Sequence, residues 1–147
     1  MANQLDKKDL EILEMLKTHA KWTTHQISKK TLIPVTTVHN RIKKMEAMGI
    51  IRGYAAVLDH KKLGKGVSAF ILADVKEDGA AGMSDLIEDI GRLKEVEEVF
   101  AVTGSTDMII KVRVDDTDSL NDFILKNLRS MEDIGRTQTF VVLSGNE

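Results

Sequence analysis

The stretch PVTTVHNRIKKMEAMG, residues 34–49, decides the fold of the N-terminal part of this chain. Pro34 suits the first turn of a helix because its φ is fixed, and Gly49 is typical of the position just after a helix. At 100° per residue, four apolar side chains between them fall within about 80° of one another, so they predict one buried face. These residues are Val35, Val38, Ile42 and Met45.

The opposite face of this predicted helix carries hydroxyl, amide and cationic groups and no carboxylate. Amides and hydroxyls read base edges in the major groove of DNA, whereas lysines neutralise phosphates. Arg41 lies beside the buried face, where its partner is either a phosphate or an acid of the first helix. We therefore predict a recognition helix, the alternative being an ordinary amphipathic helix with a solvated basic face. The predicted DNA-binding residues are Thr36, Thr37, His39, Asn40, Arg41, Lys43 and Lys44.

Two further helices are predicted upstream. The first runs from Asp6 to about Lys17, with Asp6 as its N-cap and Asp9 placed to complete a capping box. The second is short and covers Thr24–Lys30. Downstream, Ile50–Asp59 resembles one or two short strands, a wing or a linker. Three short helices followed by such a segment indicate a winged helix-turn-helix.

The net charge of −2 conceals an asymmetry along the chain. Residues 1–65 hold 13 lysines and arginines against 6 acids, a net charge of +7. Residues 66–147 hold 8 lysines and arginines against 17 acids, a net charge of −9. A basic half attracts a polyanion and an acidic half repels one, so the asymmetry supports nucleic-acid binding by the N-terminal half.

The pattern after residue 66 is strand, helix, strand, strand, helix, strand. The predicted strands cover residues 67–75, 96–103, 108–114 and 136–143, and the predicted helices cover residues 83–93 and 119–131. This β-α-β-β-α-β order is that of the ferredoxin-like fold. We therefore predict an α+β protein with a helix-turn-helix domain at 1–50, a wing or linker at 51–66 and a ferredoxin-like βαββαβ domain at 67–147.

Motifs along nearly the whole chain resemble the Lrp/AsnC (feast/famine) regulators. They are Leu5-Asp6…Asp9…Ile12-Leu13, Arg41-Ile42-Lys43-Lys44-Met45-Glu46, Gly49-Ile50-Ile51-Arg52-Gly53-Tyr54, Leu63-Gly64, Val102-Thr103-Gly104-Ser105-Thr106-Asp107 and Thr137-Gln138-Thr139-Phe140-Val141-Val142. The resemblance implies that the first domain binds DNA. It also implies that the second domain forms dimers, assembles them into octamers and binds an amino acid between dimers.

Three residues depart from the pattern of that family. Pro34 stands where the family has a serine at the start of the recognition helix, so a capping hydroxyl is missing. Leu32 stands where the family has a glycine in the preceding turn. Thr106 replaces the aromatic residue of the effector turn, which leaves the identity of the effector open.

The turn Gly104–Asp107 is the candidate effector site. Gly104 permits close approach of a ligand to the backbone, and Asp107 is able to accept hydrogen bonds from an amino group. The alternative is a tight β-turn in which glycine and aspartate serve local geometry. The resemblance adds Thr117 and Phe140. The predicted effector-binding residues are Gly104, Ser105, Thr106, Asp107, Thr117 and Phe140.

The predicted strand at 67–75 is apolar on both faces, because Phe70 and Leu72 alternate with Ala69, Ile71 and Ala73. A sheet covered by helices on one side only normally has a polar second face. A second copy of the chain covers such a face most simply, so we predict a two-fold homodimer. The resemblance implies that these dimers assemble further to an octamer. The alternative is that the linker covers this face within one chain.

The chain lacks the residues and motifs that several other classes of protein require. The chain has no cysteine, no apolar run of the length of a transmembrane helix and no signal-peptide pattern, so we expect a cytoplasmic protein without a metal site, a cofactor or a membrane partner. It has no nucleophile elbow, P-loop or HExxH motif, and we expect no enzyme. Siroheme decarboxylases resemble the same family but use histidines of the second domain, and no histidine follows His60.

The sequence therefore predicts a regulator of transcription that binds double-stranded operator DNA and responds to an amino acid. One alternative stays open: an architectural protein that compacts DNA without sequence preference and without an effector. The ratio of specific to non-specific affinity and its salt dependence separate the two.

Overall fold

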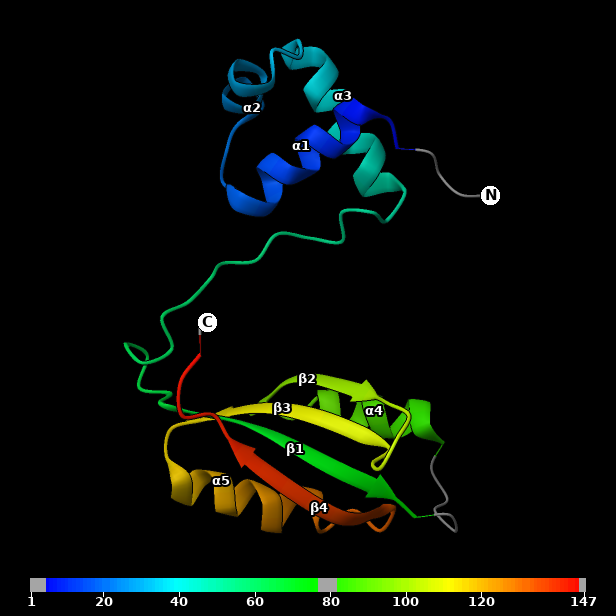
Figure 1. The fold of residues 1–147 in the computed structure, drawn as a ribbon, viewed down its shortest axis with the longest axis vertical. Coiled ribbons are helices and arrows are strands. Elements are labelled where there is room, and N and C mark those ends of the chain that lie inside the picture. The colour runs from blue at the N-terminus through cyan, green and yellow to red at the C-terminus, as the bar shows by residue number, and fades with distance from the viewer. Residues whose placement is uncertain (1–4, 77–81, 146–147) are drawn as a thin grey trace. The chain divides into compact units, whose positions relative to one another are not determined.

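The computed structural model describes residues 5–76 and 82–145. The chain divides into two compact units, Met1–Leu58 and Asp59–Glu147 (Figure 1). The border between them falls inside the segment 51–66 that we expected to be a wing or linker. The outer limits of the predicted domains, residues 1 and 147, lie outside the described residues. Within the described part of the chain, no helix has both the length and the apolar character needed to cross a membrane.

Three helices make up the described part of the N-terminal unit: α1 (Lys7–Thr18), α2 (Thr24–Thr31) and α3 (Val35–Ala47). The capping box predicted for α1 is confirmed, since the carboxylates of Asp6 and Asp9 each accept a hydrogen bond from the other residue's backbone N–H at 3.0 Å. Thr23 and Gln26 form a second capping box at the start of α2. The helices enclose a small apolar core of Ile12, Leu16, Ile27, Ile33, Val38 and Met45.

The turn between α2 and α3 contains a strained residue. Leu32 ends α2 with a φ of 60°, in the left-handed region, and it is the one non-glycine residue with positive φ in the described ranges. This conformation brings the Cβ atom close to the following carbonyl oxygen, which is why glycine is preferred there. The side chain of Leu32 is 89% exposed. The helix cap therefore imposes strain that packing of this side chain does not offset.

The segment after α3 differs from the prediction. We expected one or two short strands over Ile50–Asp59, but no strand lies between α3 and residue 67 in this fully described stretch. The segment is irregular and exposed over Arg52–Asp59. A strand requires a paired strand to satisfy its backbone groups, and a single segment of the chain supplies none here.

The C-terminal unit is an antiparallel sheet with helices between its strands (Figure 1). Its elements are β1 (Val67–Val75), α4 (Met83–Gly91), β2 (Val96–Ala101), β3 (Met108–Val114), α5 (Thr117–Phe123) with a π-helical turn η1 (Ile124–Leu128), and β4 (Ile134–Val141). The strand order is β2-β3-β1-β4. The predicted β-α-β-β-α-β order and fold class are confirmed.

Several element boundaries differ from those predicted: α4 ends at Gly91, β2 at Ala101 and β4 at Val141, each two residues early. Two further differences have a local cause. Helix α5 starts at Thr117 instead of Ser119, because the carboxylate of Asp116 caps it by accepting from the Ser119 backbone N–H at 2.7 Å. Strand β4 starts at Ile134 instead of Arg136, because Ile134 pairs with β1 beyond a register shift.

Both helices pack on the same face of the sheet. Alternate residues of β1 and β3 point to this side, and apolar side chains of α4 and α5 cover them. The buried residues of this core are Ala69, Ile71, Ala73, Leu86, Ile90, Met108, Ile110, Val112, Val114, Leu120, Phe123, Leu128 and Ile134. The other face of the sheet, here called the open face, carries the residues that alternate with them.

Candidate functional site

The outer face of α3 is exposed. Val38 and Met45 of the inner face are 0% and 1% exposed, as the helical wheel predicts. On the other side, Thr37 is half-buried and the remaining polar and cationic residues are open to solvent. These exposed residues are Thr36, His39, Asn40, Lys43 and Lys44. The helix therefore presents hydroxyl, amide, imidazole and ammonium groups together.

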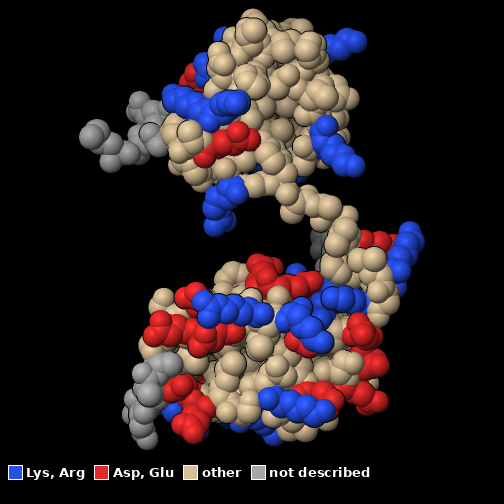
Figure 2. All heavy atoms as spheres, turned by 180° about the vertical axis from the view of Figure 1, so that it is seen from behind, with Lys and Arg blue, Asp and Glu red and all other residues tan. Residues whose placement is uncertain are grey.

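Glu46, the acid of α3, is held at the side of this face. Its Oε1 accepts a hydrogen bond from the Tyr54 hydroxyl at 3.0 Å. Partial burial and the nearby Glu46 carboxylate raise the pKa of the Tyr54 phenol, so the phenol remains a donor at neutral pH. Acidic side chains are numerous over the visible face of the C-terminal unit, as Figure 2 shows, whereas few appear on the N-terminal unit.

Arg41 belongs to neither face. Its Nη1 lies 2.7 Å from Asp6 Oδ2 and 2.7 Å from Asp9 Oδ1 at the start of α1. Of the two partners expected for Arg41, the structure shows the acid of the first helix. The two carboxylates hold the pKa of the Arg41 guanidinium above its usual value, so the ion pairs persist over the physiological pH range.

The turn between β2 and β3 is fixed by its own side chains. The Thr106 hydroxyl donates to the Ala73 carbonyl at 2.9 Å, and the Asp107 carboxylate accepts from the Val75 backbone N–H at 2.8 Å. Gly104 has a φ of 143°, a conformation that side chains disfavour. Gly104 and Ser105 are exposed. The turn thus has a structural role at the end of β1, and its tip remains open to a ligand.

A small hollow of about 30 Å³ lies beside this turn. Its lining residues are Leu72, Asp74, Ser105, Thr106, Arg136 and Gln138. Arg136 Nε lies 3.4 Å from Asp74 Oδ2, so a cation and an anion stand next to the turn. The sequence prediction did not include Asp74 and Arg136, because no motif joins them; only the pairing of β1 with β4 brings them together.

Thr117 and Phe140 are not part of this hollow. Thr117 follows β3 and the turn precedes it, so the seven-residue strand separates them by roughly 20 Å. Phe140 lies on the open face, paired with Phe70, where its side chain is 48% exposed. One chain therefore does not bring the six predicted effector residues into a single site.

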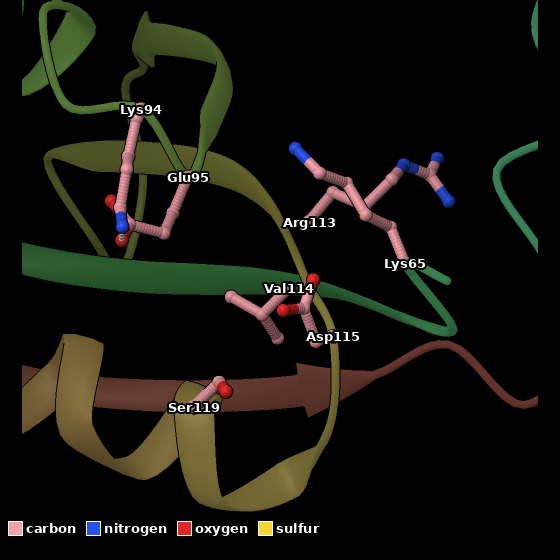
Figure 3. Close-up of a pocket in the computed structure, with 7 residues that line it drawn as sticks. All are labelled: Lys65, Lys94, Glu95, Arg113, Val114, Asp115 and Ser119. Atoms are coloured by element: carbon pink, nitrogen blue, oxygen red, sulfur yellow. Dashed lines mark ion pairs between the residues drawn. The ribbon is translucent and has the colours of Figure 1, made fainter. Parts of the chain in front are cut away.

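A second hollow of about 190 Å³ lies near the start of α5. Figure 3 shows its lining residues, which are Lys65, Lys94, Glu95, Arg113, Val114, Asp115 and Ser119. Arg113 is 9% exposed, and its Nε pairs with Glu97 at 2.5 Å. Lys94 lies 3.5 Å from Glu95. The lining thus combines the cations Lys65, Lys94 and Arg113 with the anions Glu95 and Asp115.

Aromatic side chains gather on the open face of the sheet. Phe70, Phe100 and Phe140 are 37%, 47% and 48% exposed, and Phe70 pairs directly with Phe140 across β1 and β4. Leu72 pairs with Ile109 beside them. Neither α4 nor α5 covers this apolar surface, since their buried residues pack on the other face.

Two family models match the chain and together cover both units. The winged helix-turn-helix DNA-binding model matches residues 5–52, and the Lrp/AsnC ligand binding domain model matches residues 68–145, more than half of the chain. The first match spans α1 to α3, and the second spans the sheet from the second residue of β1 onward.

Relatives of the same kind match over nearly the full length. A protein of Pyrococcus horikoshii called an HTH-type transcriptional regulator is 37% identical over 96% of this chain and 94% of its own. The HTH-type transcriptional regulator FL11 of Pyrococcus furiosus is 35% identical over 97% of this chain and 92% of its own.

Solved structures agree with this fold. The transcriptional regulator NMB0573 of Neisseria meningitidis, in complex with L-Met, has a TM-score of 0.91 at 28% identity and covers 98% of this chain and 93% of that one. AsnC of E. coli has a TM-score of 0.85 at 28% identity, and the match covers 98% of this chain and 95% of AsnC. With both domains matched in order, the chain belongs to the Lrp/AsnC family.

Proposed function

We propose that this chain is a transcription regulator that binds double-stranded DNA through the outer face of α3 and is controlled by an amino acid. The exposed face of α3 carries this proposal. Thr36 and Asn40 offer base-reading groups, and Lys43 offers a phosphate contact, all from one side of a helix in a helix-turn-helix unit. DNA as the partner and the absence of catalytic motifs support a cytoplasmic, non-enzymatic role.

We propose that the functional unit is a homodimer joined through the open face. An exposed apolar surface built around Phe70, Phe100 and Phe140 is costly in water, and a two-fold copy of the same surface removes it from solvent. A dimer also supplies two recognition helices for the two halves of a pseudo-palindromic operator. Dimers then assemble further, to an octamer, through surfaces that include the effector sites.

We propose that the effector is an amino acid and that its site lies between subunits. The relative NMB0573 is solved with L-Met, which supports an amino acid as ligand. Because the turn Gly104–Asp107 and Thr117 lie at opposite ends of β3, a site that uses both requires two copies of the chain. The effector then acts by favouring one assembly, which changes the spacing of recognition helices.

The proposal is tested by selecting binding sites from a pool of random duplexes with the full-length protein. We expect a two-fold symmetric sequence that is bound at least about 10³ times more tightly than unrelated DNA. Lys43→Ala should weaken binding to all duplexes, and Asn40→Ala should weaken binding to the selected sequence alone. Lys126→Ala, an exposed lysine of α5's continuation, is the matched control and should change neither.

Equal affinity for every duplex in the pool contradicts sequence-specific regulation and favours the architectural alternative. The effector is tested with the same selected duplex and each of the common amino acids in turn. A change of affinity or of assembly size with one of them is expected, and no change with any contradicts the sensor role.

A further inference from the structure

We infer that Arg41 is a positioning residue for DNA recognition: it ties the recognition helix α3 to the start of α1 and does not itself contact phosphate. This inference rests on the proposed DNA-binding function. It assigns Arg41 a different role from that of Asn40 and Lys43, although all three lie on one helix.

Each of the four carboxylate oxygens of Asp6 and Asp9 has a partner. Asp6 Oδ1 accepts the Asp9 backbone N–H, and Asp9 Oδ2 accepts the Asp6 backbone N–H, each at 3.0 Å. The remaining oxygens, Asp6 Oδ2 and Asp9 Oδ1, each lie 2.7 Å from Arg41 Nη1. The capping box therefore holds both carboxylates in place, and they in turn hold the guanidinium.

Burial limits what else Arg41 can reach. The side chain of Arg41 is 25% exposed, and that of Asp9 is 7% exposed. The Nε of Arg41 is buried and has no hydrogen-bond partner. Two negative charges already face this single positive charge. A phosphate approaching the site would meet net negative charge, so Arg41 is poorly suited to attract DNA directly.

The contact fixes the rotation of α3 about its axis. Only Val38 and Met45 of α3 are fully buried, while Val35 and Ile42 are half-buried, so the apolar core holds the helix along a narrow stripe. Side-chain atoms lie about 5–6 Å from a helix axis, and a roll of 20° displaces them by roughly 2 Å. Such a displacement destroys a bidentate amide–adenine contact, whose geometry Asn40 must meet.

The test compares four substitutions in the full-length protein: Arg41→Ala, Asp9→Asn, Asp6→Asn and, as the phosphate-contact control, Lys43→Ala. Affinity for the selected duplex and for an unrelated duplex is measured against salt concentration, at a temperature where circular dichroism shows each variant folded. We expect Arg41→Ala and Asp9→Asn to lower the specific affinity at least tenfold and to leave the non-specific affinity and the salt slope unchanged. Lys43→Ala should reduce the salt slope by about 0.9.

The opposite pattern overturns the inference. If Arg41 contacts phosphate, Arg41→Ala reduces the salt slope as Lys43→Ala does. In that case Asp9→Asn leaves the affinity unchanged or raises it, because it releases the guanidinium. Asp6→Asn, at the more exposed carboxylate, provides the same comparison if Asp9→Asn fails to fold. Failure of the proposed function is seen separately, because the unaltered protein then prefers no duplex at all.

Discussion

The carboxylate of Asp107 accepts a hydrogen bond from the backbone N–H of Val75, at 2.8 Å. Val75 lies two residues beyond Ala73, the last residue of β1 that pairs with β3, and Asp107 directly precedes β3. Because β3 offers no backbone partner past Met108, the side chain of Asp107 supplies an acceptor for the Val75 N–H at the end of the ladder. Asp107 therefore has a structural role in addition to the effector role that we propose for its turn.

Asp107→Ala should lower the free energy of unfolding of the C-terminal unit by about 1–3 kcal/mol, since a half-buried N–H loses its acceptor. Asp107→Asn keeps an oxygen at the same position and should lose less. Ser105→Ala, an exposed neighbour in the same turn, is the matched control. Urea unfolding followed by circular dichroism measures the difference, and equal stability of Asp107→Ala and Ser105→Ala would contradict the structural role.

Phe70→Asp should separate the proposed dimer into monomers. The substitution places a carboxylate in the centre of the open face, between Phe140 and Lys111. The Lys111 ammonium already pairs with Glu97 and Glu98, so burying one more negative charge opposes association. Leu10→Asp, at another exposed apolar side chain, should leave the dimer intact. Sedimentation equilibrium gives the mass of each variant, and a dimer that survives Phe70→Asp shows that another surface joins the copies.

The sequence predicts regular elements well where one pattern dominates. Strands β1 and β3 begin and end at the predicted residues, because each is a stretch rich in apolar and β-branched residues that starts directly after a turn-forming residue, Gly66 or Asp107. The capping box of α1 follows from Asp6 and Asp9 alone, since it depends on residues three apart. Features that depend on residues close together in the chain can therefore be predicted from the sequence.

The sequence did not predict contacts between residues that lie far apart along the chain. Arg41 lies 32 residues from Asp9, and the periodicity of α3 left its partner open between phosphate and acid. The expected strands at Ile50–Asp59 were wrong because β-branched residues predict extended backbone but do not supply a paired strand. The predicted strand at 108–114 already separates Thr117 from the turn Gly104–Asp107, and the observed β3 has the same bounds.

Leu32→Gly should stabilise the N-terminal unit by about 1 kcal/mol. Glycine removes the contact of Cβ with the carbonyl at a φ of 60°, and the exposed leucine side chain loses little packing. Leu32→Ala keeps Cβ, so it keeps the strain and is the matched control. The fluorescence of Trp22, the one tryptophan of the chain, reports unfolding of this unit because Trp22 packs against its core. Equal midpoints for the two variants would contradict the assignment of strain.

Low pH should reduce the stability of the N-terminal unit, because the Asp6 carboxylate becomes protonated. The Asp9 backbone N–H, and after it the Arg41 side chain, lower the pKa of the Asp6 carboxyl below its usual 3.8. A group whose pKa is depressed by folding contributes its stability above the unfolded value and loses it as the pH falls through the folded value. The unaltered protein should therefore be more stable than Asp6→Asn at pH 6, and the difference should shrink below about pH 3.8. Thermal unfolding followed by Trp22 fluorescence at pH 6, 4 and 3 measures that difference, and a gap that stays constant over this range would show that the Asp6 charge does not stabilise the fold.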